Sequence, residues 1–256
     1  MSYDPGVYWS DVARRIDARS PDGDWDLAGN EGPVPRYKRT LTLRRLATLD
    51  VAGKSVLELG PGPGANLRVL GQRGARRLIG YDIAPEMVRL AQRNLGDNAE
   101  VHQFDGTLPL ADQDVDVALT VTVLQHNPDT AVLRLLDELT RVTGSTLELI
   151  EDTTRFRERS FGDTYWVRDP NRYVSWVTAR GFRLVEVQAL NAWASERMSL
   201  AIERVGRLVT RRPNEEGRGP STVEVTAERL LLPFTRLIDQ RLPPMSGQTA
   251  MRFQRN

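Results

Sequence analysis

The stretch with the greatest chemical potential is VLELGPGPGANL, residues 56–67, where an apolar run reaches Glu58 and is followed by Gly60, Gly62 and Gly64. Glycine adopts backbone conformations closed to other residues and lets a ligand approach the main chain closely. In an open parallel sheet, the turn after the first strand is where nucleotide-like ligands bind. The pattern therefore predicts a binding loop.

The loop alone fits two classes of cofactor. Gly60, Gly62 and Ala65 also satisfy the looser dinucleotide pattern, in which a pyrophosphate caps the following helix. Glu58 favours the other class, because a carboxylate there sits badly beside a pyrophosphate and well beside an amine or a sulfonium. Asp82 serves both classes, since its two oxygens can accept hydrogen bonds from the ribose hydroxyls of an adenosine.

A second set of residues could carry acid–base chemistry. His126 follows the fourth apolar run and titrates near neutral pH, so it could take a proton from a hydroxyl group. Glu151 and Asp152 are expected to end the fifth run, where they could orient His126, bind acceptor hydroxyls or hold a divalent cation such as Mg²⁺. The competing interpretations are a packed histidine and a helix cap followed by salt bridges. His102, inside a predicted strand, is expected to be packed.

The segment RFRERSFGDTYWVRDPNRY, residues 155–173, is rich in arginine and aromatic residues and has little periodicity. Tyr165 and Trp166 could stack on the face of a sugar. Tyrosine, tryptophan and arginine are also enriched at the centres of protein interfaces, so a dimer contact explains the segment equally well.

The elements that must position these residues follow an alternating order. Short apolar runs, each suited to a buried strand, alternate with amphipathic helical patterns, which is typical of a parallel sheet covered on both faces. The predicted strands are 55–59, 77–81, 100–104, 115–120, 146–150 and 184–190, with a closing strand over 247–256.

Helical patterns also lie outside this alternation. Residues 7–18 and 37–49 precede the first strand, and residues 196–208 and 223–242 follow the sixth. Pro233 is expected to kink or interrupt the last helix, because proline lacks the amide donor and crowds the preceding turn. We therefore expect a helical lid over 1–50, a binding core over 51–194, a helical insertion over 195–243 and a closing strand over 244–256.

Composition limits the classes of function. The 256 residues, 40% of them hydrophobic, suffice for one sizeable core. A formal charge of +1 gives no basic excess for a nucleic acid, and the absence of cysteine excludes disulfides, thiolate metal sites and sulfur nucleophiles. No run is long enough to cross a bilayer and the first residues do not resemble a secretory signal, so we expect a cytoplasmic protein without membrane contact.

Taken in order, the motifs LELGPGPG, YDIAPEMV, QFDGTLPL, DVDVALTVTVLQH and ARGF resemble those of class I S-adenosylmethionine-dependent methyltransferases. The resemblance covers about residues 52–190 and the last strand. It implies a Rossmann-like α/β fold with a seven-stranded, mostly parallel sheet and helices on both faces.

The resemblance also implies S-adenosylmethionine as cofactor and assigns roles by position. Gly60, Gly62 and Gly64 would line the methionine part, where the Glu58 carboxylate is expected beside the amine or the sulfonium. The remaining positions are Asp82 at the ribose, Asp105 at the adenine amino group, Ile83, Phe104 and Gly106 beside the ring, and Thr120 beneath the sulfonium.

The general layout is similar to that of bacterial sugar O-methyltransferases, including those acting on methylmannoside-like precursors of polysaccharides. The leading hypothesis is methyl transfer to a hydroxyl of a sugar or glycoside, with His126, Glu151 and Asp152 acting at the acceptor. An amine acceptor such as an aminosugar, or a non-catalytic S-adenosylmethionine-binding subunit, remains open. HNPD after the fourth strand lacks the Asn-Pro-Pro-aromatic motif, which disfavours nucleic acid, and the helical insertion could form a homodimer.

Overall fold

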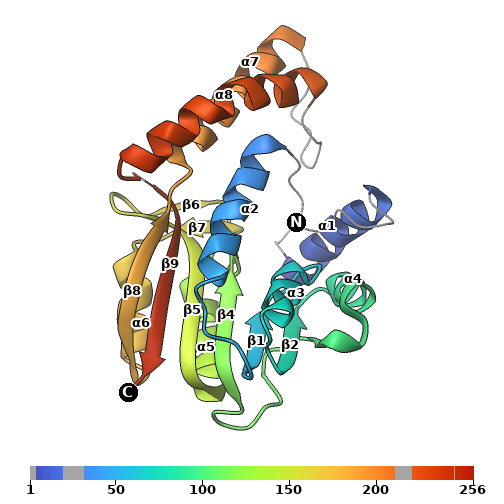
Figure 1. Cartoon of the computed structure of the whole chain (residues 1–256), viewed down its shortest axis with the longest axis vertical. Helices are drawn as coiled ribbons and strands as arrows, with labels where there is room; N and C mark the ends of the chain where they lie inside the picture. Colours follow the sequence, from blue (N-terminus) through green and yellow to red (C-terminus); the bar gives the residue numbers. More distant parts are fainter. Residues whose placement is uncertain (1–3, 20–31, 211–220, 245) are drawn as a thin grey trace.

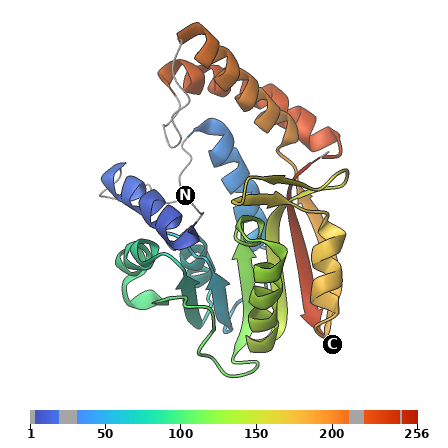
Figure 2. The ribbon, with the colours of Figure 1, turned by 180° about the vertical axis from the view of Figure 1, so that it is seen from behind.

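The computed structural model describes residues 4–19, 32–210, 221–244 and 246–256. Within them, seven strands form one sheet in the order β3-β2-β1-β4-β5-β9-β8, with helices on both faces (Figures 1 and 2). β9 is antiparallel to both of its neighbours and the other neighbouring pairs are parallel. The strands are β1 (Ser55–Leu59), β2 (Arg77–Asp82), β3 (Glu100–Gln103), β4 (Val115–Val121), β5 (Thr143–Thr154), β8 (Phe182–Leu190) and β9 (Ser246–Arg255).

The predicted strands are confirmed, but β5 is longer at both ends than the predicted 146–150. β9 pairs with β5 along the whole stretch from Thr146 to Thr154, so strand geometry continues beyond the apolar run. Glu151 and Asp152 therefore lie within β5 rather than at its end. The apolar pattern in the sequence predicts which residues of β5 are buried, whereas the length of β5 is set by its pairing with β9.

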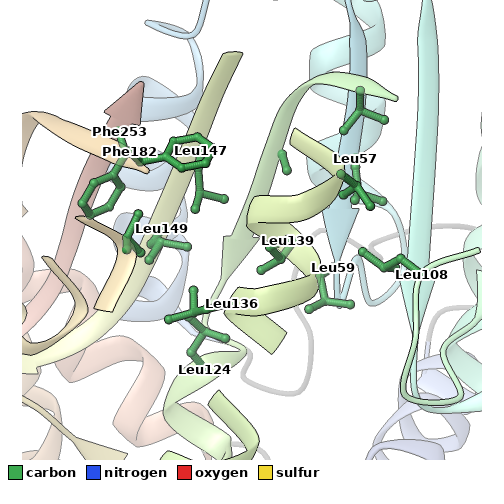
Figure 3. Packing of buried hydrophobic residues seen from close by; sticks show 14 of the residues in the cluster. Leu57, Leu59, Leu108, Leu124, Leu136, Leu139, Leu147, Leu149, Phe182 and Phe253 are labelled. Atoms are coloured by element: carbon green, nitrogen blue, oxygen red, sulfur yellow. The ribbon is translucent and has the colours of Figure 1, made fainter. Parts of the chain in front are cut away.

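One face of the sheet is covered by α5 (Asp129–Val142) and α6 (Pro170–Thr178), which lie in front of the strands in Figure 2. Leu136 and Leu139 of α5 pack into the same buried cluster as Leu57, Leu147 and Leu149 of the strands (Figure 3). Leucines three residues apart share a helix face, and residues two apart share a strand face, so both periodicities converge on this layer.

The opposite face carries α2 (Pro33–Leu46), α3 (Ala65–Gln72) and α4 (Pro85–Leu95) (Figure 1). Their leucines and valines form a second buried cluster with the other side of β1, β2 and β4. α1 (Pro5–Arg19) lies further out and packs on α4, where Val12, Ile16, Met87 and Leu90 are buried together.

α2 begins earlier than the predicted Tyr37. Pro33 starts the helix, because a proline at the first helical position lacks an amide that would have no intrahelical partner there. Residues 20–31, between α1 and α2, lie outside the described chain. Near the other end of α2, Arg45 is buried and donates hydrogen bonds to the buried carboxylate of Glu148 in β5, which also accepts from Arg252 Nε at 2.8 Å.

α7 (Trp193–Thr210) and α8 (Thr222–Arg241) stack on each other beyond the sheet edge, above α2 in Figure 1. Two buried acids of α8 hold this arrangement. Glu228 accepts from the backbone N–H of Val34 at 3.4 Å, in the first turn of α2, and Asp239 accepts from the backbone N–H of Ala194 at 2.7 Å, in the first turn of α7. α8 therefore caps two neighbouring helices with its own side chains.

α8 runs unbroken past Pro233, so the predicted interruption is wrong. The carbonyl that loses its donor belongs to Arg229, four residues earlier, and both residues are exposed. Water can satisfy that carbonyl, which removes the main reason for the helix to end. Most of the predicted loop before α8, residues 211–220, lies outside the described chain.

Residues that looked aperiodic in the sequence form a small hairpin of β6 (Arg159–Phe161) and β7 (Tyr165–Val167), followed by α6. Tyr165 and Trp166 are neighbours in β7, and successive strand residues point to opposite sides. No helix in the described part of the chain is both long and apolar enough to cross a membrane.

Candidate functional site

A cavity of about 350 Å³ opens at the carboxyl ends of β1, β2 and β4. The turn after β1 and the end of β2 form one wall, which we call the floor. Trp9 of α1 and Lys38 and Arg39 of α2 form the facing wall, which we call the roof. His126 and Gln248 border the cavity between them.

The three glycines of the floor have positive φ angles of 71°, 53° and 92° at Gly60, Gly62 and Gly64. A Cβ at Gly60 would lie 2.5 Å from Val123 Cγ2, and one at Gly64 would lie 2.7 Å from Leu95 Cδ1. A Cβ at Gly62 would meet no atom within 4 Å, and Gly62 lines the cavity. Gly60 and Gly64 thus permit packing, whereas Gly62 leaves room on the cavity side.

Asp82 fixes the floor to the end of β2. Its Oδ2 accepts from the backbone N–H of Gly62 at 3.1 Å and its Oδ1 from that of Ala84 at 3.0 Å. Burial raises the pKa of Asp82, and these two backbone donors counteract the rise. Ile83 and Phe104 line the same wall, whereas Asp105 and Gly106 lie just beyond the lining residues.

Glu58 lies behind the floor and is fully buried. Its Oε1 accepts from Asn66 Nδ2 at 2.6 Å, and Arg39 of the roof donates to the side-chain oxygen of Asn66. Burial raises the pKa of Glu58 to about 7. Asn66 and Arg39 reach the cavity and Glu58 does not, so Glu58 acts on the cavity through Asn66.

His126 ends the short helix η2 (Leu124–His126) after β4 and lines the cavity. Its Nδ1 lies 3.1 Å from the carbonyl oxygen of Thr164, and since a carbonyl only accepts, Nδ1 carries the hydrogen and Nε2 the lone pair. The ring lies 5.1 Å from that of Trp9 and 5.4 Å from that of Tyr165. Burial lowers the pKa of His126, so the neutral form is favoured at pH 7.

Glu151 is fully buried and supports the turn that carries His126. It accepts from Thr120 Oγ1 at 2.9 Å and from the backbone N–H groups of Val123 at 3.3 Å and Gln125 at 3.2 Å. Burial raises its pKa to about 7, against the effect of these donors. Glu151 and Thr120 lie under the cavity and do not line it.

Asp152 holds the other side of His126. Its backbone N–H donates to Gln125 Oε1 at 2.6 Å, and its Oδ2 accepts from the Tyr165 hydroxyl. Tyr165 is thereby kept against the His126 ring. Trp166 faces away, toward a separate surface cavity that also contains Arg168, so the structure places Tyr165 beside the main cavity and Trp166 outside it.

The roof depends on charges. Lys38 forms an ion pair with Glu196 of α7. Burial alone would lower the pKa of Lys38, but the carboxylates of Asp152 and Glu196 outweigh this effect, so the pKa of Lys38 is raised. The sequence analysis did not identify four residues of the cavity, because they come from opposite ends of the chain and belong to no motif: Trp9, Lys38, Arg39 and Gln248. His102, expected to be packed, is exposed and lies beside the Tyr81 ring.

The described residues contain no group of three or more histidine, cysteine, aspartate or glutamate side chains that could hold a metal ion. Glu151 accepts hydrogen bonds from N–H and O–H groups, which point positive hydrogens at the carboxylate where a cation would need to sit. The expected Mg²⁺ ligands Glu151 and Asp152 therefore gain no support from this geometry.

The strand order, with an antiparallel β9 between β5 and β8, and the glycine turn after β1 define the architecture. A family model described as a methyltransferase domain matches residues 57–146. The chain has the class I methyltransferase fold.

Solved structures with this methyltransferase fold cover nearly the whole chain. The [4+2]-cyclase SpnF shares 17% identity at a TM-score of 0.66, covering 98% of this chain and 95% of that one. Magnesium protoporphyrin IX methyltransferase (ChlM) from Synechocystis PCC 6803, with bound SAM, shares 14% identity at a TM-score of 0.61, covering 100% and 99%. One neighbour is named a cyclase, so the fold alone does not fix the reaction.

Curated relatives match a smaller part. A ribosomal protein L11 methyltransferase of Aeromonas hydrophila is 36% identical over 115 residues, 45% of this chain and 38% of the relative. An uncharacterized 37.1 kDa protein in transposon TN4556 of Streptomyces fradiae is 42% identical over 84 residues, 31% and 24% of the two chains. The chain thus spans less than two fifths of the length of these relatives.

Proposed function

We propose that this protein transfers a methyl group from S-adenosylmethionine to a hydroxyl group of a sugar or glycoside. The observation that carries the proposal is the position of His126. A neutral imidazole, with Nδ1 fixed on Thr164, lies in the same cavity as the Gly62 and Asp82 floor. A base in the same cavity as the cofactor wall would accelerate methylation of a weakly acidic hydroxyl.

The floor residues fit the cofactor. Asp82 lines the cavity, where its carboxylate would bind the ribose hydroxyls, and the open space at Gly62 would admit a ligand close to the main chain. Asn66 and Arg39 present polar groups to the same region, suited to the amino acid end of the cofactor. S-adenosylmethionine, when bound, supplies a methyl group on a positively charged sulfur.

Residues of the chain then remove the proton from the acceptor hydroxyl. A sugar hydroxyl is a weak nucleophile, so His126 Nε2 would take its proton as the oxygen displaces the sulfur from the methyl carbon that the bound cofactor would supply. The Thr164 carbonyl keeps the ring in the required tautomer. The carboxylate of Asp152 favours the imidazolium that results, because it raises the pKa of His126.

The acceptor side of the cavity suits a polar ligand with one apolar face. Lys38, Thr42, Asn127 and Gln248 offer hydrogen-bonding groups, and Trp9 offers an aromatic ring. Aromatic rings and amide or hydroxyl groups together are suited to a sugar. Tyr165 contributes by holding His126, in place of the direct stacking expected from the sequence.

An amine acceptor is the second candidate, and one observation favours it. Asp152 Oδ1 is buried and has no hydrogen-bond partner among the described residues, and the carboxylates of Asp152 and Glu196 both interact with Lys38, which lines the cavity. A nearby carboxylate without a full set of hydrogen-bond partners would favour an ammonium group.

The test compares the two histidines of the chain. His126→Gln is expected to lower turnover with a panel of glycosides, using labelled S-adenosylmethionine, by about a hundredfold or more. Affinity for S-adenosylhomocysteine, measured by calorimetry, should change little. His102→Gln, on the exposed face of β3, should leave both quantities as in the natural protein.

Three outcomes would change the proposal. Full turnover of glycosides by His126→Gln would remove the base mechanism. Transfer only to amines would select the second candidate. Binding of S-adenosylhomocysteine without transfer to any acceptor would indicate a non-catalytic S-adenosylmethionine-binding subunit.

A further inference from the structure

The outward face of α8 exposes more apolar surface than any other described helix. Val223 is 78% exposed, Leu230 68% and Phe234 67%. The other exposed apolar side chains of α8 are Leu231, Leu237 and Ile238. Isolated apolar residues are common on protein surfaces, but a continuous stripe of this size marks an interaction site.

The spacing of the stripe indicates the kind of partner. Val223, Ala227, Leu230, Phe234 and Leu237 follow one another at alternating intervals of four and three residues. This is the heptad seam with which one helix packs against another, and Leu231 and Ile238 widen it on one side. The stripe therefore fits a second helix.

The neighbouring helices of the same chain do not occupy this seam. Glu228, Thr235 and Asp239 lie on the opposite side of α8 and hold α2 and α7 through the hydrogen bonds to Val34, Ser195 and Ala194. Figures 1 and 2 show α7 and α8 together at the end of the molecule beyond α2. Among the residues that the structure describes, the seam of α8 stays exposed.

We propose that α8 pairs in antiparallel orientation with α8 of a second copy of this chain. A two-fold axis near residue 232 would set Leu230 against Phe234 and Ala227 against Leu237 of the second copy. The exposed stripe offers apolar area on the order of 700 Å², close to the roughly 800 Å² per partner that a standard interface buries. A symmetric pair is the commonest form of oligomer.

The charges of α8 agree with this orientation. The seam continues to Arg241 at its carboxyl end, and Val223 lies at its amino end. Antiparallel pairing sets Arg241 against Val223 of the second copy, so the two Arg241 side chains lie at opposite ends of the interface. Arg229 and Arg236 lie on a flank away from the seam, so the like charges of the two copies need not meet.

A lipid surface is the other environment that accepts an exposed apolar helix. The four-and-three spacing favours a helix partner, because a bilayer needs a broad apolar face and does not select such a seam. Docking on anionic vesicles is therefore an outcome against the proposal.

The first experiment measures mass in solution by light scattering. The natural chain is expected to show the mass of two copies at micromolar concentration. The double variant Leu230→Glu with Phe234→Glu is expected to show the mass of one, with the dimer dissociation constant raised about a hundredfold or more. Arg229→Glu, which also places a glutamate on the exposed surface of α8, is the matched control and should stay dimeric.

The second experiment uses the absence of cysteine from the sequence. In the antiparallel pair, position 231 lies one residue from the two-fold axis and therefore close to its own copy, so Leu231→Cys should form a covalent dimer on mild oxidation. Arg229→Cys, on the outer flank, should not. Circular dichroism establishes that all variants remain folded, which keeps a loss of dimer distinct from unfolding.

A natural chain that stays monomeric at about a hundred micromolar would overturn the proposal, as would a double variant that stays dimeric. Binding of the monomeric chain to vesicles of phosphatidylserine and phosphatidylcholine would assign the seam to a lipid surface instead. Binding of S-adenosylhomocysteine is measured alongside, so failure of the dimer and failure of the proposed function give separate results.

Discussion

The floor and the roof of the cavity are held by different forces. The floor is fixed by backbone hydrogen bonds, such as those from Gly62 and Ala84 to Asp82, on strands that are paired on both sides. The roof is fixed by side chains, chiefly the Lys38–Glu196 ion pair. We therefore expect ligand binding at the floor to be sensitive to an added methyl group, and ligand binding at the roof to be sensitive to a change of charge.

The largest effect is expected at the carboxylate of the floor. Asp82→Ala removes two acceptors for ribose hydroxyls, each worth about 1.5–3 kcal/mol, so affinity for S-adenosylhomocysteine should fall about a hundredfold or more. Calorimetry measures this change. Asp112→Ala, at an exposed aspartate in the loop before β4 and away from the cavity, is the control and should bind normally; unchanged binding by the Asp82 variant would remove the ribose assignment.

A methyl group on the floor should have the next largest effect. Gly62→Ala and Gly53→Ala both place a Cβ at positive φ, 53° and 71°, with no atom within 4 Å. Each should lose about 1 kcal/mol of unfolding free energy. Only Gly62→Ala should weaken binding of S-adenosylhomocysteine, by about tenfold. Equal weakening in both variants would show that strain, and not contact with the ligand, is responsible.

A charge change in the roof should act on the acceptor. Lys38→Met removes the cation that pairs with Glu196, so the acceptor KM should rise about fivefold while S-adenosylhomocysteine binds normally. Lys54→Met removes the only other lysine of the chain, whose exposed pair with Asp50 contributes little. If Lys38→Met weakened cofactor binding as much as acceptor binding, the division between floor and roof would be wrong.

The smallest expected effect is on how the stability of the ligand-free protein depends on pH. The pKa of Glu58 is raised from 4.5 to about 7, so its contribution to stability is complete below pH 4.5 and is lost as pH rises through 7. The melting temperature should therefore fall between pH 5.5 and 8. Glu58→Gln should reduce that fall by on the order of 1 kcal/mol in unfolding free energy, seen by scanning calorimetry. An identical pH profile in both proteins would contradict the assignment.

The floor could be predicted because its residues are close in sequence. Gly60, Gly62 and Asp82 belong to one strand–turn–helix–strand unit, whose geometry is local. The roof could not, because Trp9, Lys38 and Gln248 meet only after the whole chain has packed. No periodicity or spacing in the sequence predicts that these distant residues lie close together.

The errors of prediction share that cause. Trp166 was expected beside the acceptor, but its side depends on the register of the β6–β7 hairpin, which the sequence does not display. β5 extends past Ile150 because β9 pairs with it from the other end of the chain. α8 continues through Pro233 because the affected turn faces solvent, a property set by which face packs on α7.

The buried pair of Arg45 and Glu148 makes one end of α2 a fixed pivot. Arg45 and Glu148 are both buried, and they also pair with Glu186 and Arg252, whereas the leading turns of α2 are held by the 3.4 Å hydrogen bond from Val34 to Glu228 and by the ion pair of the half-buried Lys38 with Glu196. If the entrance to the cavity widens, we therefore expect the leading turns of α2 to move more readily than the end that carries Arg45. Lys38 would travel with that movement, and the sheet edge would not.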